Sequence, residues 1–89
     1  MVSKKVTIVN EMGLHMRLAG DIVKAVKAHP GADVRIRSKN KEVKASSVMQ
    51  IMMAGIKKGD EAEVIVSGSD EQAVLDELII MIQEGFGKE

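Results

Sequence analysis

The sequence contains no cysteine, tryptophan or tyrosine, and its single phenylalanine, Phe86, is its only aromatic residue. The absence of cysteine excludes a disulfide framework, thiolate chemistry and any metal site with cysteine ligands. The core must therefore be aliphatic, and the aromatic platforms on which single-stranded nucleic acids stack are missing. Lysine and arginine total 13 and aspartate and glutamate total 13, so no net positive charge attracts a nucleic acid either. We expect no nucleic-acid partner.

Long hydrophobic runs are also absent. No segment approaches the roughly 20 apolar residues that a membrane-spanning helix needs, and residues 1–10 lack the apolar run of a signal peptide. We therefore expect a cytoplasmic protein without membrane insertion. Its 89 residues predict one domain, residues 1–89. The two histidines are far apart in the sequence, with no paired ligands at helical spacing, so we expect no metal site and no cofactor.

Apolar residues alternate with polar ones in some segments and recur at helical spacing in others. This pattern predicts strands at residues 2–9, 32–38, 41–45 and 62–67, helices at 15–28 and 47–54, and a last helix with a buried stripe over 74–82. Ser47 with Gln50, and Ser69 with Gln72, match the capping box that begins many helices. The order β-α-β-β-α-β-α indicates an α+β open-faced sandwich, in which helices cover one face of a four-stranded antiparallel or mixed sheet.

His15 stands where a loop becomes a helix, a position that serine, threonine, aspartate or asparagine caps better. The positive end of the helix dipole disfavours a protonated imidazole there and so favours a neutral, nucleophilic ring. A phosphoryl group on that ring would lie near the backbone N–H groups of residues 16 and 17, and Arg17 would add charge-assisted hydrogen bonds. Gly13 is expected to leave room for a partner. These residues alone support phosphoryl chemistry and an ordinary surface histidine about equally.

The segment Gly13-Leu14-His15-Met16-Arg17-Leu18-Ala19 resembles the active-site motif of the HPr family, Gly-(Leu/Ile)-His-Ala-Arg-Pro-Ala. These proteins are the histidine-containing phosphocarriers of the phosphoenolpyruvate-dependent phosphotransferase system. Residues 47–52, Gly59 and the terminal helix resemble the family too. The resemblance implies that enzyme I phosphorylates His15 on Nδ1, that enzyme IIA-type proteins receive the group in sugar uptake, and that the chain is a carrier, not an enzyme.

Two residues depart from this motif, because Met16 replaces alanine and Leu18 replaces proline. Versions without the proline resemble carriers of regulatory, nitrogen-related branches, which are the alternative to sugar uptake. The predicted partner-binding residues lie in two segments: Leu14, Met16, Leu18, Met49, Gln50 and Met52. For the methionines, filling gaps in the core is an equally good explanation. A non-catalytic interaction module on the same scaffold, with His15 incidental, is the rival from another class.

Ser46 and Ser47 precede the second helix. In some HPr proteins the equivalent serine is phosphorylated by a dedicated kinase. Counting from Gly55 favours Ser47, whereas counting from His15 favours Ser46. A cap role alone also explains Ser47. A phosphate there would place about two negative charges beside the docking surface, so a serine kinase/phosphorylase is a candidate partner. We expect a monomer, because a carrier must present one face to two partners in turn.

Overall fold

The computed structural model describes residues 1–11 and 13–84. In these residues the chain forms β1 (Val2–Thr7), α1 (Met16–Lys27), β2 (Ala32–Ser38), β3 (Lys41–Lys44), α2 (Val48–Met53), β4 (Glu61–Gly68) and α3 (Glu71–Gln83). The order is the predicted one, and the predicted boundaries of the strands and the first two helices agree to within two residues. The sole aromatic, Phe86, lies outside the described residues.

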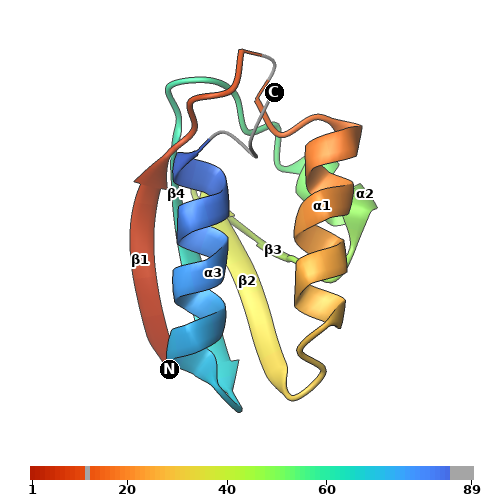
Figure 1. The fold of residues 1–89 in the computed structure, drawn as a ribbon. Helices are drawn as coiled ribbons and strands as arrows, with labels where there is room; N and C mark the ends of the chain where they lie inside the picture. The colour runs from red at the N-terminus through yellow and green to blue at the C-terminus, as the bar shows by residue number, and fades with distance from the viewer. Residues whose placement is uncertain (12, 85–89) are drawn as a thin grey trace.

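The four strands form one sheet in the order β1-β4-β2-β3, and every neighbouring pair is antiparallel. Helices α1 and α3 run side by side across one face of the sheet, and the other face is open (Figure 1). The predicted open-faced sandwich is confirmed, with an antiparallel rather than a mixed sheet. In the described residues, no helix is long and apolar enough to cross a membrane.

The core lies between the sheet and the helices and is aliphatic. Strands contribute every second residue, such as Val64 and Val66 of β4, because successive side chains point to opposite faces. Helix α1 contributes a stripe at helical spacing, with Leu18 and Ile22 each 1% exposed, and α2 contributes the fully buried Ile51. By packing α1 and α2 in this core, the chain brings the loop before α1 and the loop after α2 into contact.

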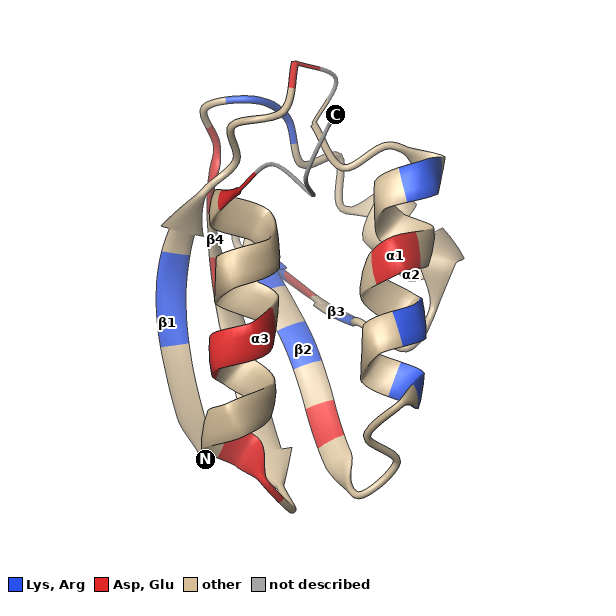
Figure 2. Ribbon diagram, in the orientation of Figure 1, with Lys and Arg blue, Asp and Glu red and all other residues tan. Residues whose placement is uncertain are grey.

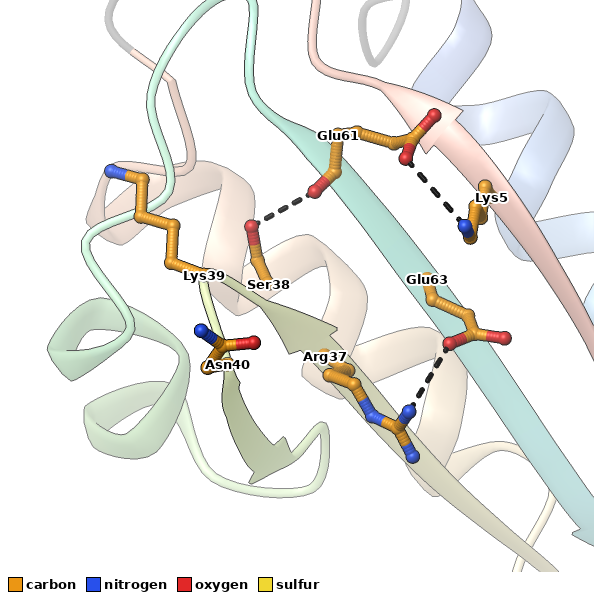
Figure 3. Close-up of a pocket in the computed structure, with 7 residues that line it drawn as sticks. All are labelled: Lys5, Arg37, Ser38, Lys39, Asn40, Glu61 and Glu63. Atoms are coloured by element: carbon orange, nitrogen blue, oxygen red, sulfur yellow. Dashed lines mark hydrogen bonds and ion pairs between the residues drawn. The ribbon is translucent and has the colours of Figure 1, made fainter.

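The open face of the sheet is polar. Arg37 lies between two acidic side chains of neighbouring strands, with Nη1 3.7 Å from Glu63 Oε1 and Nη2 3.2 Å from Glu42 Oε1. A hollow of about 280 Å³ on this face is lined by Lys5, Arg37, Ser38, Lys39, Asn40, Glu61 and Glu63 (Figure 3). None of the predicted site residues lines it. Its ion pairs stabilise a solvated sheet surface through cross-strand pairing.

The turn between β2 and β3 has the left-handed backbone that its sequence predicts. Asn40 has φ 65° and Lys39 has φ 53°, as a two-residue hairpin turn of type I′ requires. Lys39 Nζ also donates to Gly55 O at 3.1 Å and lies 3.0 Å from Asp60 Oδ2. The hairpin is thereby tied to the loop that follows α2.

Of the two predicted capping boxes, one forms in half and the other does not form: Ser47 caps α2, but Gln50 Oε1 accepts from Lys44 N and not from Ser47 N. Ser47 is the N-cap of α2, and its Oγ accepts a hydrogen bond from Gln50 N at 3.3 Å. The Ser69–Gln72 prediction is wrong: the N-cap of α3 is Asp70, in a left-handed conformation with φ 53°. The chain reaches α3 through a tight turn, and this geometry leaves Ser69 outside the capping position.

Candidate functional site

His15 is the N-cap of α1, as the sequence predicts. Its backbone is extended, with φ −77° and ψ 178°, and its carbonyl accepts the first bond of the helix, from Ala19 N at 2.9 Å. The side chain is half-exposed and makes no capping hydrogen bond. Because that first bond starts at residue 19, the N–H groups of residues 16 to 18 do not donate to carbonyls of the helix itself. The imidazole therefore stands at the positive end of the helix dipole.

The first turn of α1 is basic. It contains Arg17, which is exposed, and no acidic residue. Figure 2 shows a basic residue close to the start of α1 and the nearest acidic band one turn further on. A negatively charged group on the ring of His15 would therefore meet a favourable dipole, with the basic Arg17 in the same turn and no carboxylate from that turn to repel it.

The loop before His15 is held by the loop that follows α2. Leu14 N donates to Ile56 O at 3.1 Å, and Gly13 N donates to Asn10 O at 3.0 Å. Gly13 has φ 66°, and a Cβ on it would lie 2.4 Å from Ile56 O and 2.7 Å from the Cα of Lys57. Gly13 is thus buried against backbone, which corrects the expectation that it leaves room for a partner. Its role is to bring two backbones into contact.

Asp60 stabilises the loop that follows α2. Its Oδ2 accepts a hydrogen bond from Lys57 N at 2.8 Å and lies 3.0 Å from Lys39 Nζ. The hydrogen bond from the Lys57 amide, followed by the interactions with Lys39, holds the pKa of Asp60 below its usual value. Sequence reasoning missed this supporting role of Ile56, Lys57 and Asp60. The available signal was Asp60 at the end of a short turn with two glycines.

Two of the predicted partner-binding residues are in the core. Leu14 is 5% exposed and Leu18 is 1% exposed, so neither side chain is available to a partner. The prediction is corrected on physical grounds: Leu14 enters the core just before the helix, and Leu18 begins the buried stripe of α1. Leucine at position 18 therefore adds to the core instead of changing the surface around His15.

Four methionines, one beside His15 and three in α2, are on the surface. Met16, Met49, Met52 and Met53 are 68%, 72%, 39% and 69% exposed. We call these four residues the methionine surface. The three on α2 are exposed, whereas Ile51 of the same helix is fully buried. Core filling is therefore not the explanation of these four methionines.

The remaining predicted residues of α2 are polar. Gln50 is exposed, but its Oε1 accepts a hydrogen bond from Lys44 N at 2.9 Å, so its side-chain oxygen is engaged with the end of β3. Ser47 is half-buried and its Oγ caps α2, whereas Ser46 is exposed. The structure thus places the two serines in different environments at one end of the short helix.

The second histidine lies at the other end of α1. His29 Nε2 is 3.1 Å from Glu77 Oε1 of α3, so it links the two long helices. Helix α1 has 12 residues, which places the two histidines roughly 18 Å apart along its axis. Within residues 1–11 and 13–84, no group of three or more acidic or histidine side chains is arranged to hold a metal ion.

Comparisons with known proteins agree with this geometry. A family model described as the PTS HPr component phosphorylation site matches residues 2–84. The phosphocarrier protein HPr of Treponema pallidum is 34% identical over 89 residues, covering all of both chains. The crystal structure of HPr-C-His from Thermoanaerobacter tengcongensis has a TM-score of 0.93 and 30% identity, and the match covers 100% of this chain and 99% of that one. Crh of Bacillus subtilis, solved as a dimer with a swapped domain, has a TM-score of 0.75 and 33% identity over 96% and 97% of the two chains.

An open-faced sandwich with a histidine and an arginine at the start of its first helix defines a class of phosphoryl carriers. The chain belongs to the HPr family, the phosphocarrier proteins of the phosphotransferase system. It is accordingly a phosphocarrier and not an enzyme that turns over a substrate of its own.

Proposed function

We propose that His15 takes a phosphoryl group from phosphorylated enzyme I, with phosphoenolpyruvate as the original source, and passes it to enzyme IIA-type proteins. The observation that carries the proposal is the position of His15 at the N-cap of α1, beside Arg17, in a turn without acidic residues. Each transfer forms a bond between phosphorus and a ring nitrogen while the bond to the donor breaks. Such transfers depend on positioning and charge stabilisation, which this turn supplies.

The docking surface for both partners is the exposed apolar side chains around His15. Met16, Met49 and Met52 are exposed, and flexible thioether side chains adapt to more than one partner. Gln50 contributes its exposed face beside them. A cytoplasmic monomer presents this face to enzyme I and to the acceptor in turn. Light scattering at micromolar concentration tests the monomer against the swapped dimer described for Crh.

The departures from the family motif raise the choice between sugar uptake and a nitrogen-related branch. Since Leu18 is buried, any change in partner choice has to come from the exposed Met16 and Gln50. A panel of IIA acceptors from both branches, assayed with wild type, Met16→Ala and Gln50→Gly, tests this. We propose sugar uptake as the leading branch. Faster transfer to nitrogen-branch acceptors would reverse that choice.

The test of the main proposal uses both histidines. Incubation with enzyme I and phosphoenolpyruvate should add one acid-labile phosphoryl group to wild type and none to His15→Ala. His29→Ala is the matched control and should be labelled like wild type, because His29 contacts Glu77 at the far end of α1. Labelling of His15→Ala would refute the assignment. A partner that binds His15→Ala unchanged, with no transfer to wild type, would favour the non-catalytic interaction module.

Arg17 is expected to change the rate of transfer without changing its end point. A charge-assisted hydrogen bond contributes about 1.5–3 kcal/mol, so Arg17→Ala should slow phosphorylation by roughly ten- to a hundredfold. Arg17→Lys should lose less, because it keeps the charge but not the planar fork. Equal rates of phosphorylation for wild type and Arg17→Ala in quench-flow experiments would contradict this role.

We also propose Ser47, rather than Ser46, as a regulatory phosphorylation site. A phosphate at Ser47 would stand at the start of α2, next to the exposed Met49, and would repel an acidic partner. A serine kinase/phosphorylase from a bacterium that has one should label wild type and Ser46→Ala. Loss of label in Ser46→Ala with retention in Ser47→Ala would place the site at Ser46.

A further inference from the structure

Methionine dominates the exposed apolar surface of this protein. In the described residues, the exposed large apolar side chains are Met1, Val9, Met16, Met49, Met52, Met53 and Ile80. Methionine occupies five of these positions, and four of the five form the methionine surface. Any aliphatic side chain would serve an apolar contact, but only methionine carries an oxidisable sulfur. The choice of residue therefore adds a reactivity that leucine or valine would not bring.

The methionine surface is close to His15. Helices α1 and α2 pack against each other, so Met16 at the start of α1 and the methionines of α2 belong to neighbouring elements (Figure 1). Helix α2 ends at Met53, and the chain then reaches Ile56, whose carbonyl accepts the hydrogen bond from Leu14 N. Leu14 directly precedes His15. Met16 follows His15 directly, and the other three methionines lie on the helix that packs against α1 and leads into the loop bonded to Leu14.

We propose that the methionine surface is an oxidative modification site that controls docking at His15. In each event a thioether attacks hydrogen peroxide or a hypohalous acid, a two-electron oxygen donor. A sulfur–oxygen bond forms, the sulfur loses two electrons, and the O–O or O–halogen bond breaks with release of water or halide and a proton. The product is a sulfoxide, which thiol-dependent methionine sulfoxide reductases return to the thioether with formation of a disulfide and water.

The consequence follows from polarity. A sulfoxide is strongly polar, so its burial against an apolar partner surface loses the stabilisation that a thioether gives. The inference rests on the proposed function, because it concerns docking of the phosphoryl donor and acceptor. His15 itself keeps its ring, its helix terminus and Arg17. Oxidation should therefore weaken the encounter with partners and leave the transfer step within the complex intact.

The experiment separates docking from chemistry. The chain is treated with hydrogen peroxide, the oxidant is removed with catalase, and phosphorylation by enzyme I is then measured over a range of carrier concentrations. We expect KM for the carrier to rise about tenfold, roughly the loss of one buried methionine contact, with kcat within about twofold. Peptide mapping should place sulfoxides on Met16, Met49 and Met53 before the less exposed Met52, and also on the exposed Met1. Reductase treatment should restore KM.

Two variants keep the test specific. In the first, all four residues of the methionine surface become leucine, which keeps size and apolarity. Its KM for transfer is measured before and after treatment with peroxide, and the treatment should leave this KM unchanged. In the second, Met1→Leu is combined with Met81→Leu, two positions outside the methionine surface, and sensitivity should remain. Circular dichroism melts should show that exposed sulfoxides leave the fold intact.

Two outcomes would overturn the inference while leaving the proposed function standing. One is an unchanged KM for a chain whose four surface methionines are all oxidised. The other is an equal loss of transfer in the leucine variant, which would assign the effect to another methionine. A chain that accepts no phosphoryl group before any oxidation would refute the proposed function, and the inference would fall with it.

Discussion

Helices α1 and α3 lie side by side on one face of the sheet, and the chain leads into them in similar ways. A glycine with a left-handed backbone precedes each helix and is wedged against a carbonyl from another part of the chain. A Cβ on Gly13 would lie 2.4 Å from Ile56 O, and one on Gly68 would lie 2.4 Å from Gly31 O. The segments that precede α1 and α3 therefore both use a glycine with positive φ to bring two backbone segments into close contact.

The first turns of these helices differ in charge. Helix α3 has Glu71, whose Oε2 accepts a hydrogen bond from Gly68 N at 3.1 Å and lies 3.1 Å from the N-terminal ammonium of Met1. Helix α1 has no acidic residue in its first turn and contains Arg17 instead. In α3 the chain provides its own anion at the positive end of the dipole, whereas α1 is suited to an anion from outside. We infer from this difference in charge that the start of α3 contributes to stability, whereas the start of α1 is available for an anion.

The largest effect is expected from the two glycines. Gly13→Ala and Gly68→Ala should each destabilise the protein by about 3 kcal/mol, because an alanine Cβ meets backbone atoms in a strained conformation. Urea melts measure this loss. Only Gly13→Ala should also slow phosphorylation of His15 at temperatures where both variants are folded.

Gly20 provides the control for these substitutions. It lies within α1, and a Cβ there has nothing within 4 Å, so Gly20→Ala should stabilise the protein by about 0.5–1 kcal/mol. If Gly68→Ala slowed phosphorylation as much as Gly13→Ala, the effect would come from general destabilisation and not from the position of His15.

The second prediction concerns a variant in which the first turn of α1 gains an acidic residue, as in α3. Met16→Glu should stabilise the helix by about 0.3–1 kcal/mol, through the dipole, and at the same time slow phosphorylation about tenfold, by repulsion of the phosphoryl group. Met16→Gln has the same size without the charge and separates repulsion from the loss of apolar surface. Met16→Glu is thus expected to raise the free energy of unfolding and to lower the rate of phosphorylation. Equal rates for the glutamate and glutamine variants would contradict the electrostatic account.

The third prediction concerns the two capping boxes. Ser47→Ala should cost about 1 kcal/mol, because Ser47 Oγ accepts the hydrogen bond from Gln50 N. Ser69→Ala should change stability by less than about 0.5 kcal/mol, because Ser69 is exposed and is not the N-cap of α3. Thermal melts of the two variants compare identical sequence patterns in different backbones. Similar losses would mean that Ser69 has a structural role after all.

These serines also show how far the sequence predicts the fold. Periodicity predicts the order of the elements and their bounds because burial imposes a period of two on strands and 3.6 on helices. Capping depends on the backbone angles just before a helix. Ser47 is extended, with φ −129°, but the chain reaches α3 through a left-handed Asp70. Nothing in the local pattern distinguishes these two backbone conformations.

The candidate site was predictable where it depends on neighbours in the sequence. His15 and Arg17 share one helical turn, so their geometry follows from the start of α1. The burial of Leu14, and the contact of Gly13 with Ile56, depend on a loop more than 40 residues away in the sequence. Contacts of that range have no periodic signature, and for this reason Gly13 and Leu14 were wrongly expected to face a partner. The burial of Leu18, in contrast, follows the helical spacing of the stripe in α1.

The smallest effect is expected at Glu71. Hydrogen bonds from the N-terminal ammonium and from Gly68 N hold the pKa of Glu71 below its ordinary value of 4.5. A carboxyl whose pKa is lower in the folded state than in the unfolded state stabilises the fold above its unfolded-state pKa, and this contribution is lost as the pH falls through the folded-state pKa. Glu71→Gln should therefore melt slightly below wild type at neutral pH, and the difference should shrink as the pH falls below about 4.5.

Glu84→Gln, at the other end of α3, is the matched control. An acidic residue near the C-terminus of a helix opposes the dipole, so its removal should leave the melting temperature unchanged or raise it slightly. A difference between wild type and Glu71→Gln that stays constant from about pH 3 to neutrality would contradict the proposed role of the carboxylate. The acidic start of α3 would then be a feature of sequence without consequence for stability, and the contrast with α1 would rest on Arg17 alone.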